Sequence, residues 1–596
     1  MSDHPQSAPL PFSGKILFMI GAIFMSTTEI PAKEIILDHN QEVLVERNVP
    51  MVTRDGVTLR ADIFRPNRDG KFPVIVERIP YDRRIETFGP RAASSGYVFV
   101  VQDTRGRFAS EGEWYPIRHE RDDGYDTVEW AAALPYSNGK VGLFGYSYSA
   151  ATQLAAATAA PPHLVCIMPV VMGANAHEHW VYVGGAFSQA LNQGWTSGLT
   201  INALERRVGG SVQPSHWDMK QPLSSYPLLE LGTTTGLADY YFDWLKHPDY
   251  DDYWKELSFA ERFDKITVPA LHVGAWYDYF QQGSIECYLG IKQRGGSEVA
   301  RKGQRLVMMV GGHAGPGPKV GEVDFGASSV LDLWALALRW YDYTLKGIDN
   351  GMAVEKPVRL FVMGSDQWRD ADDWPVPGAP AMRYYLRSGG KANTAAGDGR
   401  LSTEAPDQEA ADRYTYDPAN PVPTVGGPAF GDATLKQGPY NQAEVEKRPD
   451  VLVYSTDPLG RDTEVIGAVR LELQVSSSAV DTDFTGKLVD VAPDGTAVNL
   501  TEGIIRARYR AGREKAMFVE PGQIFPITVD LGSTAFVFKA GHRIRVEVSS
   551  SNFPRFDRNL NTGADIASRS PESRKADNAV YHDAVHSSVL VVQALR

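Results

Sequence analysis

Cysteine is almost absent from this sequence, whose 596 residues include only Cys166 and Cys287. Both stand among apolar neighbours, and neither belongs to a spacing typical of metal ligands. We therefore expect buried thiols and exclude a disulfide framework and a structural zinc site. The sequence predicts neither a metal nor an organic cofactor.

Basic residues are scarce relative to acidic ones. Lys and Arg number 60 against 73 Asp and Glu, which gives a formal net charge of −13. A broad positive surface is therefore not expected, and the pattern excludes DNA and RNA as partners. A homo-oligomer is compatible with this composition.

No apolar run near the N-terminus is long enough to span a membrane. The run from Ile16 to Met25, after Lys15, is too short. It has the length of a secretory signal core, but the segment before it contains Asp3 and little positive charge, and no clear A-x-A cleavage site follows. We expect a cytoplasmic protein, with secretion as the alternative if residues 16–25 act as a signal core. Residues 1–45 are interpreted as a leader, either disordered or signal-like.

The most informative stretch runs from Val141 to Ala151, where a short apolar strand meets a serine and then an alanine-rich helix. Gly145-Tyr-Ser147-Tyr-Ser149 follows the G-x-S-x-G pattern of a nucleophile elbow, with Ser149 in place of the second glycine. Small neighbours permit the sharp turn that exposes the serine Oγ in such an elbow. We predict that Ser147 is a nucleophile, with an ordinary strand–turn–helix as the alternative.

Three other Gly-x-Ser triplets, beginning at Gly209, Gly295 and Gly326, lack this context. Around the elbow, residues 73–79 and 97–103 suit parallel strands buried on both faces, and residues 122–134 are typical of an amphipathic helix. A hairpin is expected over 49–64, with its turn at Asp55-Gly56. Alternation of strands and helices predicts a doubly wound α/β sheet with its catalytic groups at the carboxyl ends of strands.

The pattern of residues changes twice beyond the elbow. Residues 173–265 are rich in helical and aromatic segments, which we interpret as an inserted lid, before strands resume at 270–273 and 306–310. From about residue 353, short alternating strands separated by Gly, Pro and Asp turns indicate an antiparallel sandwich. The predicted division is an α/β core over 46–172 and 266–352, a helical lid over 173–265 and a β domain over 353–596. Residues 388–411 are expected to be an exposed loop.

Several blocks, in order, resemble the CocE/NonD hydrolases, a family that includes cocaine esterase, α-amino acid ester hydrolases, glutaryl acylases and X-prolyl dipeptidyl peptidases. The resemblance covers nearly everything after about residue 45, and it implies an α/β-hydrolase core with a C-terminal jelly roll. The blocks are residues 101–114, the elbow at 145–148, His272-Val-Gly-Ala-Trp-Tyr-Asp278, residues 338–351 and residues 546–558.

A serine nucleophile needs a histidine to take its proton and a carboxylate to orient that histidine. In α/β-hydrolases these groups follow later strands in the order Ser, acid, His. Asp278 and His313 satisfy this order, and the resemblance implies the acid role for Asp278 through Gly-x-Trp-Tyr-Asp. Family members usually read Gly-Pro-Trp-x-His, whereas Gly311-Gly312-His313 is two residues shorter. His272 precedes the acid inside a strand, so we expect it to have a core role.

Attack on a carbonyl creates an oxyanion that needs hydrogen-bond donors. The residue after the nucleophile, Tyr148, offers its backbone N–H. The resemblance implies a second donor, the hydroxyl of Tyr81 in Ile79-Pro80-Tyr81, for which packing is the alternative. Asp103, Arg105 and Arg107 also have the character of site residues, but the role expected for them is an internal salt bridge that holds the loop. The lid aromatics could line an acyl or leaving-group pocket or pack the lid's own core; they are Trp180, Tyr182, Phe187 and Trp195.

Together these patterns predict a serine hydrolase that cleaves carboxylic ester or amide bonds of small molecules through an acyl-enzyme on Ser147. One alternative is an aminopeptidase of the X-Pro dipeptidyl-peptidase type, although those enzymes usually carry an extra N-terminal domain for which the first 45 residues leave no room. A more remote alternative is a non-catalytic protein that binds ligands through its C-terminal sandwich.

Overall fold

The computed structural model describes residues 32–85, 88–212, 228–230, 236–313, 315–429, 435–568 and 572–595. Residues 16–25, the segment considered as a signal core, lie outside these ranges. Across the described ranges, no helix combines the length and apolar character needed to cross a membrane.

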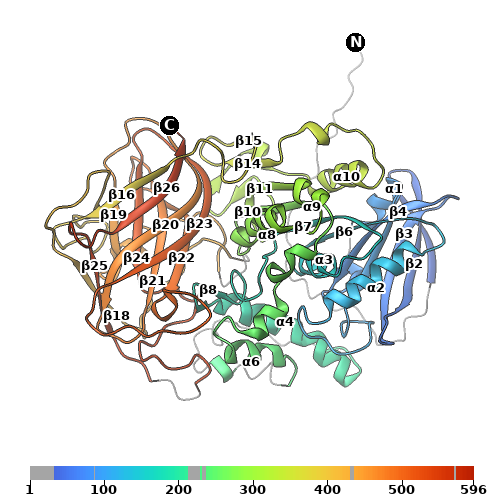
Figure 1. Cartoon of the computed structure of the whole chain (residues 1–596), viewed down its shortest axis with the longest axis horizontal. Coiled ribbons are helices and arrows are strands. Elements are labelled where there is room, and N and C mark those ends of the chain that lie inside the picture. The colour runs from blue at the N-terminus through green and yellow to red at the C-terminus, as the bar shows by residue number, and fades with distance from the viewer. Residues whose placement is uncertain are drawn as a thin grey trace, which may run out of the picture.

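The N-terminal half, which carries the sequence-predicted catalytic residues, is organised on one large sheet (Figure 1) with the strand order β1-β2-β3-β5-β4-β6-β7-β10-β11-β14-β15. From β5 to β14 the neighbouring strands are parallel, whereas β1, β2 and β3 at one edge and β15 at the other are added antiparallel. The strands are β1 Ala32–Asp38, β2 Gln41–Val52, β3 Thr58–Pro66, β4 Phe72–Ile79, β5 Val98–Asp103, β6 Ser137–Tyr146, β7 Leu164–Val170, β10 Ala270–Tyr277, β11 Gln304–Gly312, β14 Val358–Val362 and β15 Gln367–Ala371.

Helices cover both faces of this sheet, as the continuous apolar runs of its central strands predict. Val74 of β4 belongs to a hydrophobic cluster with Val128 and Leu154, whereas its neighbour Ile75 belongs to a second cluster with Trp340. Alternate residues of one strand therefore face two different helical layers. The helices of the core are α1 Gly89–Ser94, α2 Glu120–Ala132, α3 Tyr148–Thr158, α8 Gln281–Arg294, α9 Glu298–Lys302 and α10 Leu333–Thr344, with the short turns η1 Arg83–Ile85, η4 Ala327–Ser329 and η5 Met352–Val354 and the ribbon β12 Lys319–Val320 and β13 Val323–Asp324.

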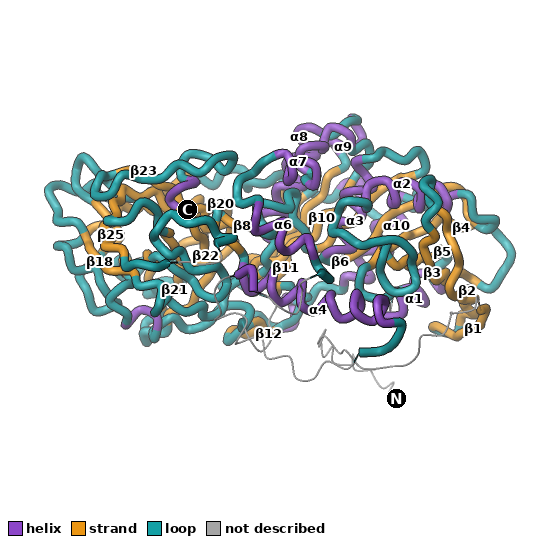
Figure 2. The backbone as a smooth tube through the Cα atoms, turned by 90° about the horizontal axis from the view of Figure 1, so that it is seen from below, coloured by secondary structure: helices purple, strands orange, loops and turns teal. Residues whose placement is uncertain are grey.

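A predominantly helical lid is inserted between β7 and β10, as predicted. Its large side chains, including Trp244, Trp254 and Tyr241, are buried at 2% exposure or less and belong to the same hydrophobic cluster as Val74 and Val128 of the α/β core. Figure 2 shows helices gathered in the N-terminal half, while the C-terminal half is built mainly of strands and loops. The lid elements are β8 Tyr182–Val183, β9 Ala186–Phe187, α4 Gln189–Val208, η2 Leu228–Glu230, α6 Asp239–Lys246, α7 Asp252–Leu257 and η3 Ala260–Lys265.

The C-terminal domain is an all-β jelly roll in which inward and outward residues alternate as predicted. In β20, Val469, Leu471 and Leu473 are buried, whereas Arg470, between Val469 and Leu471, is exposed. The strand order is β18-β25-β20-β26-β16-β17-β19-β24-β21-β22, and β23 pairs with β20. The elements are β16 Ala381–Arg387, β17 Arg400–Ser402, β18 Asp412–Tyr416, η6 Val445–Lys447, β19 Leu452–Ser455, β20 Thr463–Ser477, β21 Asp483–Val491, β22 Ala497–Arg506, η7 Ala507–Tyr509, β23 Phe525–Phe538, β24 Arg543–Ser549, β25 Ala576–Tyr581 and β26 Val589–Leu595.

Three predicted boundaries differ from those in the structure. Residues 32–45 of the predicted leader form β1 and the start of β2, which pair from Ala32 opposite Arg47 to Asp38 opposite Gln41. Strands β14 and β15 lie after the predicted boundary at 353 but join the large sheet of the N-terminal half, because β14 pairs in parallel with β11. The predicted loop 388–411 contains β17, which pairs with β16. In each case pairing with a neighbour stabilises a strand whose own sequence signal is weak.

Candidate active site

Ser147 occupies a sharp turn between β6 and α3, as the elbow pattern predicts. Its φ of 58° and ψ of −122° are unfavourable for a residue with a side chain, and its N–H is held by the carbonyl of Val170 at 3.0 Å. Gly145 is required here, because a Cβ at that position would lie 2.4 Å from Ser149 Cβ. The turn therefore places Ser147 at the carboxyl end of a central strand, where α/β sheets carry their sites.

The sequence-predicted acid and histidine meet Ser147 at this edge of the sheet. Nε2 of His313 lies 2.8 Å from Ser147 Oγ, and Nδ1 lies 2.7 Å from Asp278 Oδ2. The other carboxylate oxygen of Asp278 accepts the backbone N–H of Phe280 at 2.7 Å. His313 is 8% exposed and Asp278 is 1% exposed. With the Nδ1 proton facing the carboxylate, Nε2 is the nitrogen that can accept the proton of the serine.

His272 stays in the core of the sheet, as expected from its place inside β10. Its Nε2 lies 2.8 Å from Gln304 Oε1, and the side chain is buried. Burial lowers the pKa of His272 to about 4 from its ordinary value of 6.5. This histidine is therefore neutral at physiological pH and is paired with a glutamine.

Tyr81 reaches the nucleophile from the loop after β4. Its hydroxyl accepts the indole N–H of Trp195 at 3.0 Å and interacts with the side chain of Ser147. Burial raises the pKa of Tyr81, so the phenol keeps its proton and remains a donor. The hydrogen bond from Trp195 was not predicted from the sequence, since nothing in the local pattern reveals which lid residue meets Tyr81.

Tyr148 presents its side chain and its backbone to different partners. The hydroxyl donates to Glu120 Oε1 at 3.0 Å and accepts the N–H of Ile117 at 2.7 Å, both remote from the reaction centre. Its backbone N–H belongs to the first turn of α3, where N–H groups have no carbonyl partner within the helix. The N–H, not the phenol, is thus the group of Tyr148 that is suited to bind an oxyanion beside Ser147.

An arc of aromatic rings connects Tyr81 to His313. Trp195 packs on Trp180 with ring centroids 5.3 Å apart, Trp180 contacts Phe280 at 6.1 Å, and Phe280 contacts the imidazole of His313 at 5.5 Å. Phe280 was missed in the sequence analysis, although its position two residues after Asp278 is a signal that it adjoins the site. The arc forms a continuous apolar wall beside the nucleophile.

The other two predicted pocket residues do not join this wall. The hydroxyl of Tyr182 donates to the carbonyl of Trp244 at 2.8 Å, and its ring stacks on His177 with centroids 4.8 Å apart. Phe187 packs edge-on against Tyr182 and Tyr241. Both side chains are fully buried, so Tyr182 and Phe187 pack the lid's own core.

Asp103 and Arg105 form internal salt bridges, as expected, with partners from outside their own loop, whereas Arg107 binds backbone carbonyls. Arg107 is buried and donates to the carbonyls of Pro80 at 2.8 Å and Leu199 at 3.0 Å. It thereby connects the segment that carries Tyr81 to the lid helix α4. The partners of the other two residues are Arg83 for Asp103, and Asp55 and Asp123 for Arg105.

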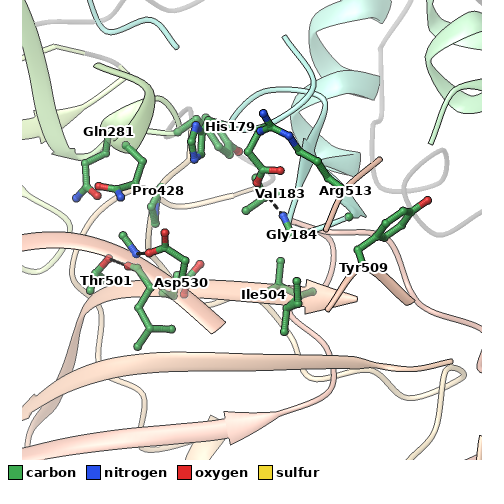
Figure 3. Close-up of a pocket in the computed structure, with 18 of the residues that line it drawn as sticks. His179, Val183, Gly184, Gln281, Pro428, Thr501, Ile504, Tyr509, Arg513 and Asp530 are labelled. Atoms are coloured by element: carbon green, nitrogen blue, oxygen red, sulfur yellow. Dashed lines mark hydrogen bonds between the residues drawn. The ribbon is translucent and has the colours of Figure 1, made fainter. Parts of the chain in front are cut away.

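A separate cavity of about 430 Å³ lies between the lid hairpin β8–β9 and the C-terminal domain (Figure 3). Val183 and Gly184 line it from the lid, and Ile504 and Asp530 line it from the jelly roll. Asp278 also borders it, but Ser147, Tyr81 and His313 do not. The cavity is therefore distinct from the space in front of the serine.

Both cysteines are buried, as predicted, and burial raises the pKa of each thiol. Within the described ranges, no group of three or more His, Cys, Asp and Glu side chains is placed to hold a metal ion.

Comparison with known proteins places this geometry in a family. Residues 55–315 match the family model of the X-Pro dipeptidyl-peptidase (S15 family), and residues 350–591 match that of the X-Pro dipeptidyl-peptidase C-terminal non-catalytic domain. The cocaine esterase of Rhodococcus sp. (strain MB1 Bresler) is 38% identical over 586 residues, which cover 94% of this chain and 100% of the relative. The chain belongs to the CocE/NonD family of serine hydrolases.

Other members of the CocE/NonD family and its neighbours agree with this assignment. A putative serine esterase of Mycobacterium bovis is 26% identical, covering 84% of this chain and 90% of the relative. The crystal structure of an α-amino acid ester hydrolase superposes with a TM-score of 0.79 at 25% identity, covering 98% of this chain and 100% of that one. This CocE/NonD protein is thus an enzyme, a serine hydrolase with an α/β-hydrolase core and a C-terminal jelly roll.

Proposed function

We propose that this CocE/NonD hydrolase cleaves carboxylic esters by acyl transfer to Ser147. His313 acts as the general base, Asp278 orients it, and Tyr81 and Tyr148 stabilise the oxyanion. The observation that carries the proposal is the continuous hydrogen-bonded chain from Asp278 through His313 to Ser147, with distances of 2.7 and 2.8 Å. A serine hydroxyl is a weak nucleophile until such a base removes its proton.

The geometry supports the usual two-step reaction of a serine hydrolase. As Ser147 Oγ attacks the carbonyl carbon, Nε2 of His313 takes its proton, and the negative charge of Asp278 stabilises the imidazolium. The phenol of Tyr81 and the backbone N–H of Tyr148 donate to the developing oxyanion. The imidazolium then protonates the leaving alcohol, and water, activated by the same histidine, releases the acid from Ser147.

The acyl group is proposed to be apolar and aromatic. The wall beside Ser147 is made of the rings of Trp180, Trp195 and Phe280, whose exposures are 4%, 6% and 3%. Aromatic rings favour flat apolar groups, which they contact edge-on or with an offset stack. The name of the Rhodococcus relative states that it acts on cocaine, which makes cocaine a suitable member of a substrate panel.

The main alternative remains an Xaa-Pro aminopeptidase, because the matching family models carry that description. The two activities are separated by a panel of nitrophenyl esters with acetyl, butyryl and benzoyl groups, together with cocaine and an Xaa-Pro nitroanilide. We expect the benzoyl ester to have the highest kcat/KM. Faster turnover of the Xaa-Pro nitroanilide would favour the peptidase.

The assignment of the nucleophile is tested by Ser147→Ala, with Ser149→Ala from the same elbow as the matched control. Turnover and labelling by a fluorophosphonate should be abolished in Ser147→Ala and largely kept in Ser149→Ala, because Ser147 is the serine that is hydrogen-bonded to His313. Labelling of the Ser147→Ala protein at the wild-type rate would refute the assignment. A cytoplasmic location and a homo-oligomeric state remain predictions from the sequence.

A further inference from the structure

The backbone reaches His313 through two glycines at the end of β11, where Gly312 pairs with Tyr277 of β10. Residues 311 and 312 are both glycine, and Gly311 adopts a φ of +133°, a conformation that residues with a side chain rarely adopt. The turn is closed by one described backbone hydrogen bond, from Gly315 N–H to the carbonyl of Gly312 at 3.0 Å. Since the imidazole must stay within hydrogen-bond distance of Ser147, contacts from outside the turn are needed to fix it.

One such contact comes from Tyr146, the residue before the nucleophile. Its hydroxyl donates to the carbonyl of His313 at 2.8 Å, with a longer contact of 3.4 Å to the carbonyl of Gly312. Its ring also packs edge-on against the imidazole, with centroids 5.7 Å apart and an interplanar angle of 67°. Because Tyr146 is the last residue of β6, it couples the elbow directly to the loop of the base.

The second contact comes from Gln437 of the C-terminal domain. In the amide orientation that satisfies both neighbours, its oxygen accepts the N–H of Gly312 at 2.7 Å and its nitrogen donates to the carbonyl of Ala429 at 3.1 Å. The segment is anchored by paired backbone hydrogen bonds between Gly427 and Gly438 of 2.7 and 3.0 Å. Glycine is needed at residue 312, since a Cβ there would lie 1.7 Å from the end of the Gln437 amide and 2.6 Å from the backbone carbonyl oxygen of Tyr277.

We propose that Tyr146 and Gln437 are positioning residues, which hold His313 against Ser147 by hydrogen bonding to the backbone on two sides. Tyr146 binds the carbonyl of His313, while Gln437 binds the N–H of the preceding glycine. The catalytic domain and the jelly roll each contribute one of these two hydrogen bonds. The C-terminal domain therefore takes part in catalysis by fixing the general base. This inference rests on the proposed role of His313 as the base.

The proposal predicts a loss of kcat without a matching change in KM. Tyr146→Phe keeps the ring but removes the hydroxyl, so the base is held less firmly, and we expect kcat for a nitrophenyl ester to fall about 10- to 100-fold. Tyr341→Phe is the matched control, because its hydroxyl donates to the carbonyl of Leu143 on the same strand at 2.7 Å, away from His313. That variant should lose stability and keep kcat.

Gln437 offers an independent test with a conservative variant. Gln437→Met removes both amide hydrogen bonds at similar volume and should lower kcat in the same range as Tyr146→Phe. Gln437→Glu retains an oxygen that can accept the N–H of Gly312, so it should recover most of the lost rate. If both variants had the same low rate, the hydrogen bond to Gly312 would not be what positions the base.

A double-mutant cycle distinguishes a positioning role from a general structural one. When His313 is replaced by Ala, Tyr146→Phe has no base left to misplace, so it should change the residual rate less than about 2-fold. An equal loss in both backgrounds would overturn the proposal. Ser147→Ala, measured in the same assay, separates this positioning proposal from the proposed function. If Ser147→Ala is inactive while Tyr146→Phe and Gln437→Met match the wild type, the positioning proposal is wrong and the proposed function stands.

Discussion

The indole N–H of Trp195 donates to the hydroxyl of Tyr81 at 3.0 Å. Trp195 lies on the lid helix α4, whereas Tyr81 follows β4 of the catalytic sheet, so one hydrogen bond joins the lid to the proposed oxyanion donor. Because a phenol oxygen that accepts one hydrogen bond directs its own proton elsewhere, this contact leaves the proton of Tyr81 available to the neighbouring Ser147.

Tyr81→Phe should therefore lower kcat by about 100- to 1000-fold, the range found when one oxyanion donor is removed from an enzyme. KM should change little, because the ring remains. Trp195→Phe should have a smaller effect on kcat, about 10-fold, since it only releases the phenol from its orientation. Steady-state kinetics with a nitrophenyl ester measure both. A change confined to KM in Tyr81→Phe would identify Tyr81 as a binding residue.

The aromatic wall leads to a prediction about substrate preference. Trp180→Ala opens the wall beside Ser147, so kcat/KM for a benzoyl ester should fall more than for an acetyl ester, by about 1–3 kcal/mol in relative transition-state binding. Tyr182→Phe is the control, because its hydroxyl contacts the carbonyl of Trp244 inside the lid core. The ratio of the two kcat/KM values should be unchanged in this control. If Tyr182→Phe shifted the ratio as strongly, the pocket would lie deeper in the lid than the arc of rings indicates.

The elbow and the triad could be predicted because topology constrains them. In an α/β-hydrolase the nucleophile, acid and base follow successive strands, so the order of apolar runs favours Asp278 and His313, and the resemblance to the CocE/NonD hydrolases implies the acid role of Asp278. The identity of the lid contacts could not be predicted in this way. Trp180 and Tyr182 are two residues apart, yet one meets Phe280 at the site and the other meets His177 in the lid core.

Edge strands and interdomain contacts were missed for a related reason. β14 and β15 are only five residues long each, and their pairing with the catalytic sheet depends on β11, which is distant in sequence. Gln437 has no local pattern that would connect it to Gly312. Such features depend on tertiary contacts rather than on periodicity, so a single sequence carries little signal for them.

Burial of His272 predicts a pH dependence of stability that is independent of catalysis. The folded protein holds this side chain neutral with a pKa of about 4, whereas an unfolded chain protonates it below its ordinary pKa of 6.5. Between these values the unfolded state binds more protons, so this contribution to stability is lost as the pH falls from 6.5 toward 4. At pH 4.5 the loss amounts to about 2–3 kcal/mol.

His272→Gln should remove that dependence and should leave kcat near the wild-type value, because the side chain contacts Gln304 and not Ser147. Thermal unfolding of both proteins at pH 7 and pH 4.5 provides the comparison, and the fall in midpoint should be smaller for the variant. Loss of activity in His272→Gln, with His313→Ala still active, would show that the base has been assigned to the wrong histidine.

The lid hairpin gives the last prediction, which concerns how the lid is docked on the jelly roll. Gly184 has a φ of +53°, and its carbonyl accepts the N–H of Arg506 at 2.8 Å. A Cβ on Gly184 would lie 2.1 Å from the carbonyl oxygen of Ile504, which is backbone and cannot swing aside. Gly184→Ala should therefore destabilise the protein by about 2 kcal/mol or more, through the strained backbone and the forced separation of the two surfaces.

Gly194 provides the opposite case within the same lid. It lies in the interior of α4, and a Cβ there would meet no atom within 4 Å. Alanine favours the helix over glycine by about 1 kcal/mol, so Gly194→Ala should raise the thermal midpoint while Gly184→Ala lowers it. Limited proteolysis adds a second readout, since a lid that is displaced from Ile504 should be cleaved faster in Gly184→Ala than in the wild type. Equal midpoints and equal cleavage rates would mean that the hairpin adapts and that its close contact with β22 does not hold the lid in place.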